Sequence, residues 1–147
     1  MKISFDLDDT IISKSRFALE KEPLLGKLIG AERIRLGTIV LFKQLKAKGY
    51  KVGIYTTSFR SKAKIRRMFW LYGISVDYII NQHEHDKVLR EKRKNISKYP
   101  PAFGIDVHID DLVGVELEGK RHNFTTIIVS TDDDKWVDKI LERINML

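Results

Sequence analysis

Short runs rich in β-branched and aromatic residues alternate with helix-like segments along this chain, and that alternation constrains its fold more than any other feature. Runs of this composition and length predict β-strands. We expect five strands, at residues 2–8, 50–57, 76–81, 105–110 and 124–130. Strands separated by helices form right-handed βαβ units, so the sequence predicts an α/β protein with a mostly parallel five-stranded sheet.

Three of the intervening segments carry apolar residues at the three- and four-residue spacing of a helix. They are residues 36–45, followed by Gly49 as a C-cap, residues 61–72, and residues 136–144, for which Asp132 or Asp133 is the expected N-cap. Helices on both faces of the sheet would give a Rossmann-like three-layer sandwich, and 147 residues suit one domain over 1–147. Residues 13–33 fit neither pattern, so we expect a flap or irregular helix there.

The composition is that of a globular protein, and we expect no membrane segment and a cytoplasmic location. The chain has no cysteine, which excludes disulfides and thiolate catalysis. Its net charge of +7 is concentrated in two basic runs, residues 60–67 and 87–98. Positive charge of this kind favours an anionic partner, although each run is also compatible with a solvated helix face.

Acidic and hydroxyl side chains stand where three of the predicted strands end. The first predicted strand ends in Asp6 and Asp8, the second in Thr56 and Thr57, and the fourth in the pair Asp110-Asp111. Parallel strands bring these ends to one edge of the sheet, which is where ligands bind in such folds. Clustered carboxylates repel one another, and an all-oxygen ligand set favours a hard cation such as Mg²⁺.

These segments resemble the haloacid dehalogenase-like hydrolase superfamily. Its first motif, Asp-x-Asp-x-Thr after an apolar strand, is matched by Asp6-Leu7-Asp8-Asp9-Thr10. Its second, an apolar strand ending in Thr or Ser, is matched at Thr56, and its fourth, a strand ending in two acids, at Asp110-Asp111. The resemblance spans essentially the whole chain and implies a phosphatase that works through an aspartyl-phosphate.

The resemblance also implies roles for individual residues. Asp6 would be the nucleophile and a Mg²⁺ ligand, Asp8 the general acid and then base, and Thr56 a hydrogen-bond partner of the transferring phosphoryl group. The backbone carbonyl of Asp8, together with Asp110 and Asp111, would complete the metal site.

The family's third motif is a lysine, and the sequence leaves two candidates for it. Lys87 follows the third strand closely and would start the next helix on the active edge. Lys98 lies twelve residues before Asp110, and an extended descent through Pro100 and Pro101 would let it reach the site. We favour Lys98 for the catalytic role and expect Lys87 to contact substrate.

Three other features invite a functional interpretation, and for each we prefer a structural one. We interpret His83-Glu84-His85 as a solvated polar loop rather than a metal site. His108 alternates with apolar neighbours inside a strand, which is typical of a core histidine with satisfied hydrogen bonds. Trp136 is expected to anchor the core.

Cap domains select substrates in this family, and neither insertion point has room for one, so we expect a capless member with an open site. The partner would be a phosphorylated substrate, either a small molecule such as a nucleotide or a macromolecule such as a nucleic-acid terminus, and a second subunit could close the site. Thr57 and Arg60 are expected to contact that substrate. The alternative is a protein that binds phosphate or nucleic acid on the same fold without turnover.

Overall fold

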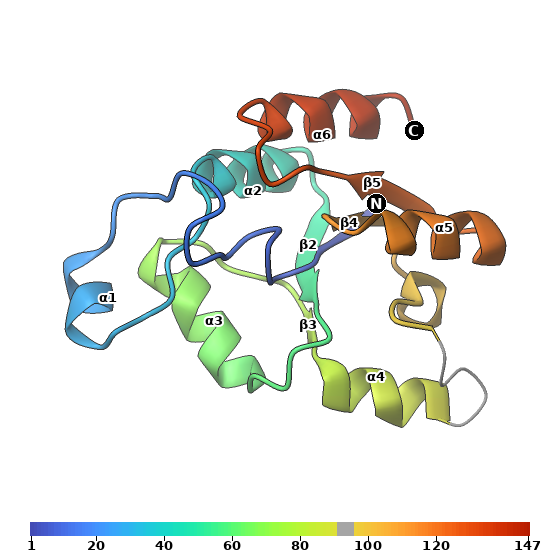
Figure 1. The fold of residues 1–147 in the computed structure, drawn as a ribbon, viewed down its shortest axis with the longest axis horizontal. Coiled ribbons are helices and arrows are strands. Elements are labelled where there is room, and N and C mark those ends of the chain that lie inside the picture. The colour runs from blue at the N-terminus through green and yellow to red at the C-terminus, as the bar shows by residue number, and fades with distance from the viewer. Residues whose placement is uncertain (91–95) are drawn as a thin grey trace.

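The computed structural model describes residues 1–90 and 96–147, which form one α/β unit around a five-stranded sheet (Figure 1). All the strand pairs are parallel, in the order β3-β2-β1-β4-β5. The strands are β1 (Lys2–Phe5), β2 (Lys51–Tyr55), β3 (Ile79–Ile80), β4 (Val107–Asp110) and β5 (Thr125–Ile128). The predicted fold class and all five strand positions are confirmed, although each strand is shorter than its apolar run.

Five helices cover the two faces of this sheet: α2 (Thr38–Ala47), α3 (Lys62–Leu71), α4 (Gln82–Leu89), α5 (Val113–His122) and α6 (Trp136–Asn145). The described residues also contain the short helix α1 (Leu24–Leu28), which lies away from the sheet (Figure 1), and a 3-10 turn, η2 (Pro100–Phe103). The three helices expected from periodicity correspond to α2, α3 and α6. No helix in the described part of the chain is long and apolar enough to cross a membrane.

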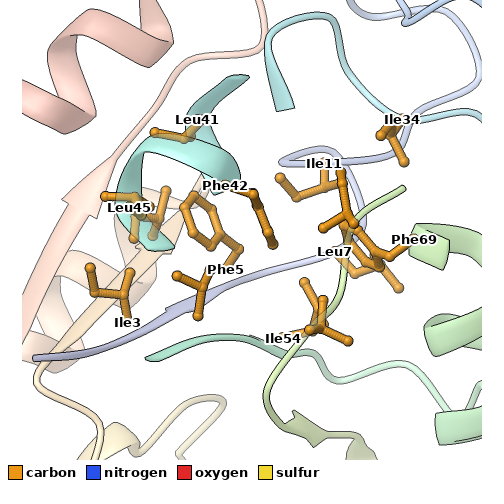
Figure 2. Packing of buried hydrophobic residues seen from close by; sticks show 14 of the residues in the cluster. Ile3, Phe5, Leu7, Ile11, Ile34, Leu41, Phe42, Leu45, Ile54 and Phe69 are labelled. Carbon is orange, nitrogen blue, oxygen red and sulfur yellow. The ribbon is translucent and has the colours of Figure 1, made fainter. Parts of the chain in front are cut away.

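One face of the sheet carries the main apolar core, because alternate strand residues point to opposite sides. Ile3 and Phe5 pair in register with Val52 and Ile54, and all four are buried under α2, α3 and α6. The ring centroids of Phe42 and Phe5 are 4.9 Å apart. Figure 2 shows the two rings packed together within this cluster. Trp136 is buried in the same cluster, which confirms it as a core anchor.

The opposite face is more polar, and α4, α5 and η2 cover it. Ser4 and His108 are directly paired across β1 and β4, and both are fully buried. Tyr55 belongs to a small apolar cluster with Ile80 and Ile105 on this side. Polar groups buried here must find hydrogen-bond partners within the protein, and this requirement shapes the candidate site.

The structure corrects three local predictions. Residues 83–85 belong to α4 rather than to a loop, because the Asn81 carboxamide caps that helix by accepting the Glu84 N–H at 3.1 Å. Lys87 consequently lies in the last turn of α4, not at a helix start. The N-cap of α6 is Lys135 rather than Asp132 or Asp133, since Asp133 accepts the N–H of Lys135, one residue before the helix begins.

Residues 13–33 form an excursion between β1 and α2 that contains α1, as expected of a flap with an irregular helix. It projects to one side of the molecule beside α3 (Figure 1). Isolated bridges from Ile12 to Ile34 and from Leu19 to Arg35 close its base. Three cations of the second basic run, Lys92, Arg93 and Lys94, lie outside the described residues.

Candidate active site

The strand order brings the predicted residues to one edge of the sheet. Asp6 is the first residue after β1. Because β1 lies between β2 and β4, Asp6 is flanked by Thr56 on one side and Asp110 on the other. The Asp6 N–H still donates to the Ile109 carbonyl at 2.8 Å, and the Thr56 N–H donates to Ile80 at 2.9 Å. The sheet therefore fixes the backbone of each of these positions before any ligand is bound.

Lys98 reaches this edge from the polar face of the sheet. It is buried, and its ammonium donates to the Asp6 carboxylate and, at 2.9 Å, to the Tyr55 carbonyl. The Asp110 carboxylate lies 3.9 Å from the same nitrogen. Lys87, the other candidate, is exposed on α4. Of the two lysines, the structure thus places Lys98 beside Asp6.

The route of the chain to Lys98 differs from the expected one. Pro100 and Pro101 begin the 3-10 turn η2 instead of an extended descent. Proline suits the first position of such a turn, because its missing N–H would have no partner there. The position of Lys98 at the acids was therefore predicted from an incorrect local conformation.

Three side chains hold the segment that carries Lys98. The Glu118 carboxylate of α5 accepts from the N–H of Ser97 at 3.0 Å and of Lys98 at 3.2 Å. The Tyr55 hydroxyl accepts from the Tyr99 N–H at 2.9 Å and lies 2.6 Å from Nδ1 of His85. A neutral His85 ring has one unprotonated nitrogen, which can accept the proton of the Tyr55 hydroxyl. Burial lowers the pKa of His85, which keeps this ring neutral and able to accept.

Burial dominates the electrostatics of Asp6. It raises the pKa of Asp6 from 3.8 to about 6, assisted by the negative charge of Asp110 and opposed by Lys98. Two carboxylates and one ammonium share this buried space, so a negative charge remains uncompensated when both acids are ionised. A cation or a proton would relieve that excess.

Asp110 has a hydrogen-bonded support of its own. Its Oδ2 lies 3.1 Å from Nε2 of His108, whose Nδ1 lies 2.7 Å from the Ser4 hydroxyl. Burial acts to raise the pKa of Asp110, but the bond from His108 and the charge of Lys98 outweigh it and hold the pKa below its ordinary value. The prediction of a satisfied core histidine is confirmed. His108 also orients an acid of the site, which period-two spacing along β4 could have indicated.

Asp8 lies at the rim of the site. The chain turns at Asp9, whose φ is +59°, and the Asp8 side chain is 53% exposed. Its carboxylate accepts from Arg60 at 3.0 Å, and Arg60 also forms a two-point ion pair with Glu32 at 2.7 and 3.0 Å. Glu32, on the flap, was not expected from the sequence. These three side chains line a hollow of about 480 Å³ beside the flap, which Lys14 and Arg33 also line.

The remaining predicted residues have simpler surroundings. The Asp111 carboxylate accepts from the Thr10 hydroxyl at 3.0 Å, and burial raises the pKa of Asp111. Thr56 is buried, and its oxygen accepts from the Ser58 N–H at 3.0 Å, which leaves the hydroxyl proton available to a ligand. Thr57 is exposed beside it.

The donor atoms of this edge suit a hard cation. Asp6 and Asp110 supply carboxylate oxygens, and Mg²⁺ is commonly held by one or two carboxylates together with substrate phosphate and water. Within residues 1–90 and 96–147, no three His, Cys, Asp or Glu side chains are gathered closely enough to hold a metal by themselves. The residues fit an ion that substrate helps to hold, and not a metal cage built of protein alone.

No protein-family model matches the chain, and no curated protein matches it.

Proposed function

We propose that this protein is a Mg²⁺-dependent phosphohydrolase of the haloacid dehalogenase-like type, with Asp6 as its nucleophile. The observation that carries the proposal is the buried Asp6 carboxylate at the end of β1, in contact with the ammonium of Lys98 and beside Asp110. An aspartate at the carboxyl edge of a parallel sheet, with a fixed cation at hand, is equipped to attack phosphorus.

The reaction would proceed as two displacements. The Asp6 carboxylate attacks the phosphorus of a monoester, the bond from phosphorus to the leaving oxygen breaks, and Asp8 gives that oxygen a proton. Asp8 then takes a proton from water as the water attacks the aspartyl-phosphate, releasing phosphate and regenerating Asp6. Each carboxylate thus returns to its starting state.

The surrounding side chains support both displacements. Lys98 offsets negative charge on the nucleophile and phosphoryl group, while the Thr56 hydroxyl donates to a phosphoryl oxygen. Asp6, Asp110 and the Asp8 carbonyl would hold Mg²⁺, with Asp111 beside them, and the ion supplies charge neutralisation for the phosphoryl oxygens when bound. Arg60, now shared between Asp8 and Glu32, is within reach of a substrate in the adjoining hollow.

Neither described segment, residues 7–37 or residues 56–78, contains a large cap, which supports a substrate that needs little enclosure. The residues between Asp6 and Thr38 contain only the five-residue helix α1, and those between β2 and β3 contain α3. A phosphate ester with a bulky leaving group could therefore approach the carboxyl edge of the sheet, with Thr57 as a further expected contact.

Asp6→Asn tests the proposal directly. We expect hydrolysis of p-nitrophenyl phosphate by the wild type only with Mg²⁺, and a loss of at least about a hundredfold in the variant, because an amide cannot serve as the nucleophile. The matched control is Asp138→Asn, an exposed acid of α6, which should retain wild-type turnover.

Circular dichroism would verify that both variants are folded. Retention of more than a few per cent of activity by Asp6→Asn would exclude Asp6 as the nucleophile. A folded wild type that binds phosphate but hydrolyses none of a panel of esters would instead indicate a non-catalytic binding protein.

A further inference from the structure

The outward face of α3 carries a row of aromatic and cationic side chains that neither the core nor the proposed chemistry uses. We define the α3 stripe as Phe59, Lys62, Arg66 and Trp70, which follow one another at spacings of three or four residues. Lys62, Arg66 and Trp70 are four residues apart and so lie along one side of α3, while Phe59 lies three residues before the helix begins. The adjoining side of α3, with Ile65, Met68 and Phe69, packs into the core. Phe59 is 64% exposed and Trp70 is 66% exposed.

The cations of α3 contribute little to the stability of the folded state. Lys62 and Arg66 are like charges four residues apart, a pairing that destabilises an isolated helix. α3 has no acid in its sequence, and it also carries Lys64 and Arg67. Lys62 is ion-paired with Glu84 of α4, and Lys64 lies 3.8 Å from Glu32, so within the stripe Arg66 offers the stronger attraction to an external anion.

The alternation of side chains points to one class of partner. Cations spaced along a groove or ridge attract successive phosphates, and exposed aromatic rings between them stack on bases regardless of sequence. We infer that the α3 stripe binds a single strand of nucleic acid, with phosphates at Lys62 and Arg66 and bases against Phe59 and Trp70. Ten helical residues extend about 15 Å, the length of about four stacked nucleotides.

The position of the stripe connects it with the active edge. Phe59 comes three residues after Thr56, and its neighbour Arg60 contacts Asp8 at the rim of the hollow. The Phe59 ring also packs edge-on against His83 of α4, at 4.9 Å between centroids, which fixes this end of the stripe. A strand lying along α3 would thus present its terminus to Asp6. Only this last step rests on the proposed function; binding itself does not.

Fluorescence offers a direct test, because the two tryptophans have opposite surroundings. Trp70 is 66% exposed and Trp136 is 2% exposed, so quenching by stacked bases reports on Trp70. We would titrate Asp6→Asn protein, without Mg²⁺, with an unphosphorylated oligothymidylate of about twelve nucleotides, following both intrinsic fluorescence and the anisotropy of a labelled strand. We expect saturable binding with quenching, which weakens as salt is raised.

Matched variants separate the stripe from general positive charge. Arg66→Glu should weaken binding at least about tenfold at low salt and reduce the slope of log affinity against log salt by about one. Arg121→Glu, the same charge reversal at an exposed position of α5, should change affinity less than about twofold. Trp70→Ala should abolish the quenching and weaken binding at least about fivefold.

Several results would overturn the inference. Equal losses from Arg66→Glu and Arg121→Glu would mean diffuse attraction, and binding without quenching would exclude stacking on Trp70. Binding to phosphatidylserine vesicles or to polyglutamate as tight as binding to the oligonucleotide would assign the stripe to a membrane surface or an acidic protein.

Activity measurements distinguish failure of this inference from failure of the proposed function. With a terminally phosphorylated oligonucleotide, Arg66→Glu should lower kcat/KM while sparing p-nitrophenyl phosphate. Turnover of the small ester without oligonucleotide binding would reject the stripe alone. Oligonucleotide binding by a protein that hydrolyses no phosphate ester would reject the proposed function alone.

Discussion

At the scale of single residues, the centre of the site is a balance among three buried charges. Asp6, Asp110 and Lys98 are each less than a tenth exposed, and the lysine contacts one acid and lies 3.9 Å from the other. Removing one member of a buried charge pair is strongly destabilising, because the remaining charge loses its compensation. Lys98 thus serves the fold as well as the proposed chemistry.

Lys98→Met should make stability markedly more dependent on pH. The pKa of Asp6 already stands near 6 against its ordinary 3.8, and Lys98 is the group that lowers it most, so the variant should raise it further. A carboxyl group with a raised folded-state pKa favours the fold while protonated; its contribution is present below pH 3.8 and is lost as pH rises through the folded-state pKa. We therefore expect Lys98→Met to lose about 3 kcal/mol or more at pH ~8 and much less at pH ~5.

Urea unfolding at a series of pH values, with a chelator present, would measure this effect. The double variant Asp6→Asn/Lys98→Met is the control, and it should recover much of the loss at high pH because one of the two repelling carboxylates is gone. Parallel stability curves for the wild type and Lys98→Met would show that the lysine does not govern ionisation of the acids.

The residues of this site divide according to whether their position depends on local sequence or on packing. Asp6, Thr56 and Asp110 could be placed from sequence, because each follows an apolar run and parallel strands share an edge. Glu118 and His85 could not, since they reach the Lys98 segment from helices whose placement depends on the folded sheet. The same holds for Glu32, which meets Arg60 only because the flap returns toward α3.

At the scale of elements, glycine allows two close approaches that sequence periodicity cannot reveal. A Cβ at Gly53 of β2 would lie 2.5 Å from the Tyr78 carbonyl oxygen, and one at Gly119 of α5 would lie 2.8 Å from that of Phe124. Helix α5 therefore packs closely against β5 at Gly119, where the absence of a side chain leaves room for Phe124 and Thr126. Its buried residues are only Val115 and Gly119, which explains why no apolar stripe predicted it.

Gly53→Ala should destabilise the protein, whereas Gly114→Ala should not. The new methyl group at Gly53 meets the backbone of Tyr78, just before β3, which cannot shift without disturbing the sheet, so we expect a loss of about 1–3 kcal/mol. At Gly114, in the first turns of α5, nothing lies within 4 Å of the new carbon, and alanine should stabilise the helix by up to about 1 kcal/mol. Chemical unfolding of the two variants would compare them, and equal effects would contradict the assigned packing of β2.

The start of helix α4 was misplaced, near Lys87 instead of Gln82, for a different reason. Its first six residues are polar or charged, and its buried side chains are only His85 and Leu89. The helix is instead fixed by the Asn81 cap at its start and by the bond of His85 to Tyr55. Capping and one buried hydrogen bond thus replace the apolar stripe on which sequence prediction depends.

At the scale of the whole molecule, the sequence was sufficient for the fold class but not for the strand order. Alternation of strand and helix predicts a parallel sheet and one active edge, and the structure confirms the sheet. The order β3-β2-β1-β4-β5 then puts β1 in the centre. That central place gives Asp6 a neighbour on each side, Thr56 from β2 and Asp110 from β4, and so joins three motifs that are up to 104 residues apart, as between Asp6 and Asp110.

Binding of Mg²⁺ should be measurable as a property of the whole folded chain. An ion that binds only the folded state stabilises it by mass action, and at ten times its dissociation constant the gain is about 1.4 kcal/mol, or about 3 °C or more in melting temperature. We expect this rise for the wild type and for Asp138→Asn, and a clearly smaller one for Asp110→Asn, which removes a carboxylate beside Asp6. Ca²⁺ should also raise the melting temperature while supporting little turnover, because its looser coordination positions the phosphoryl group poorly. Equal stabilisation of the wild type and Asp110→Asn by Mg²⁺ would remove Asp110 from the proposed metal site, and Asp111 would then be the acid to test.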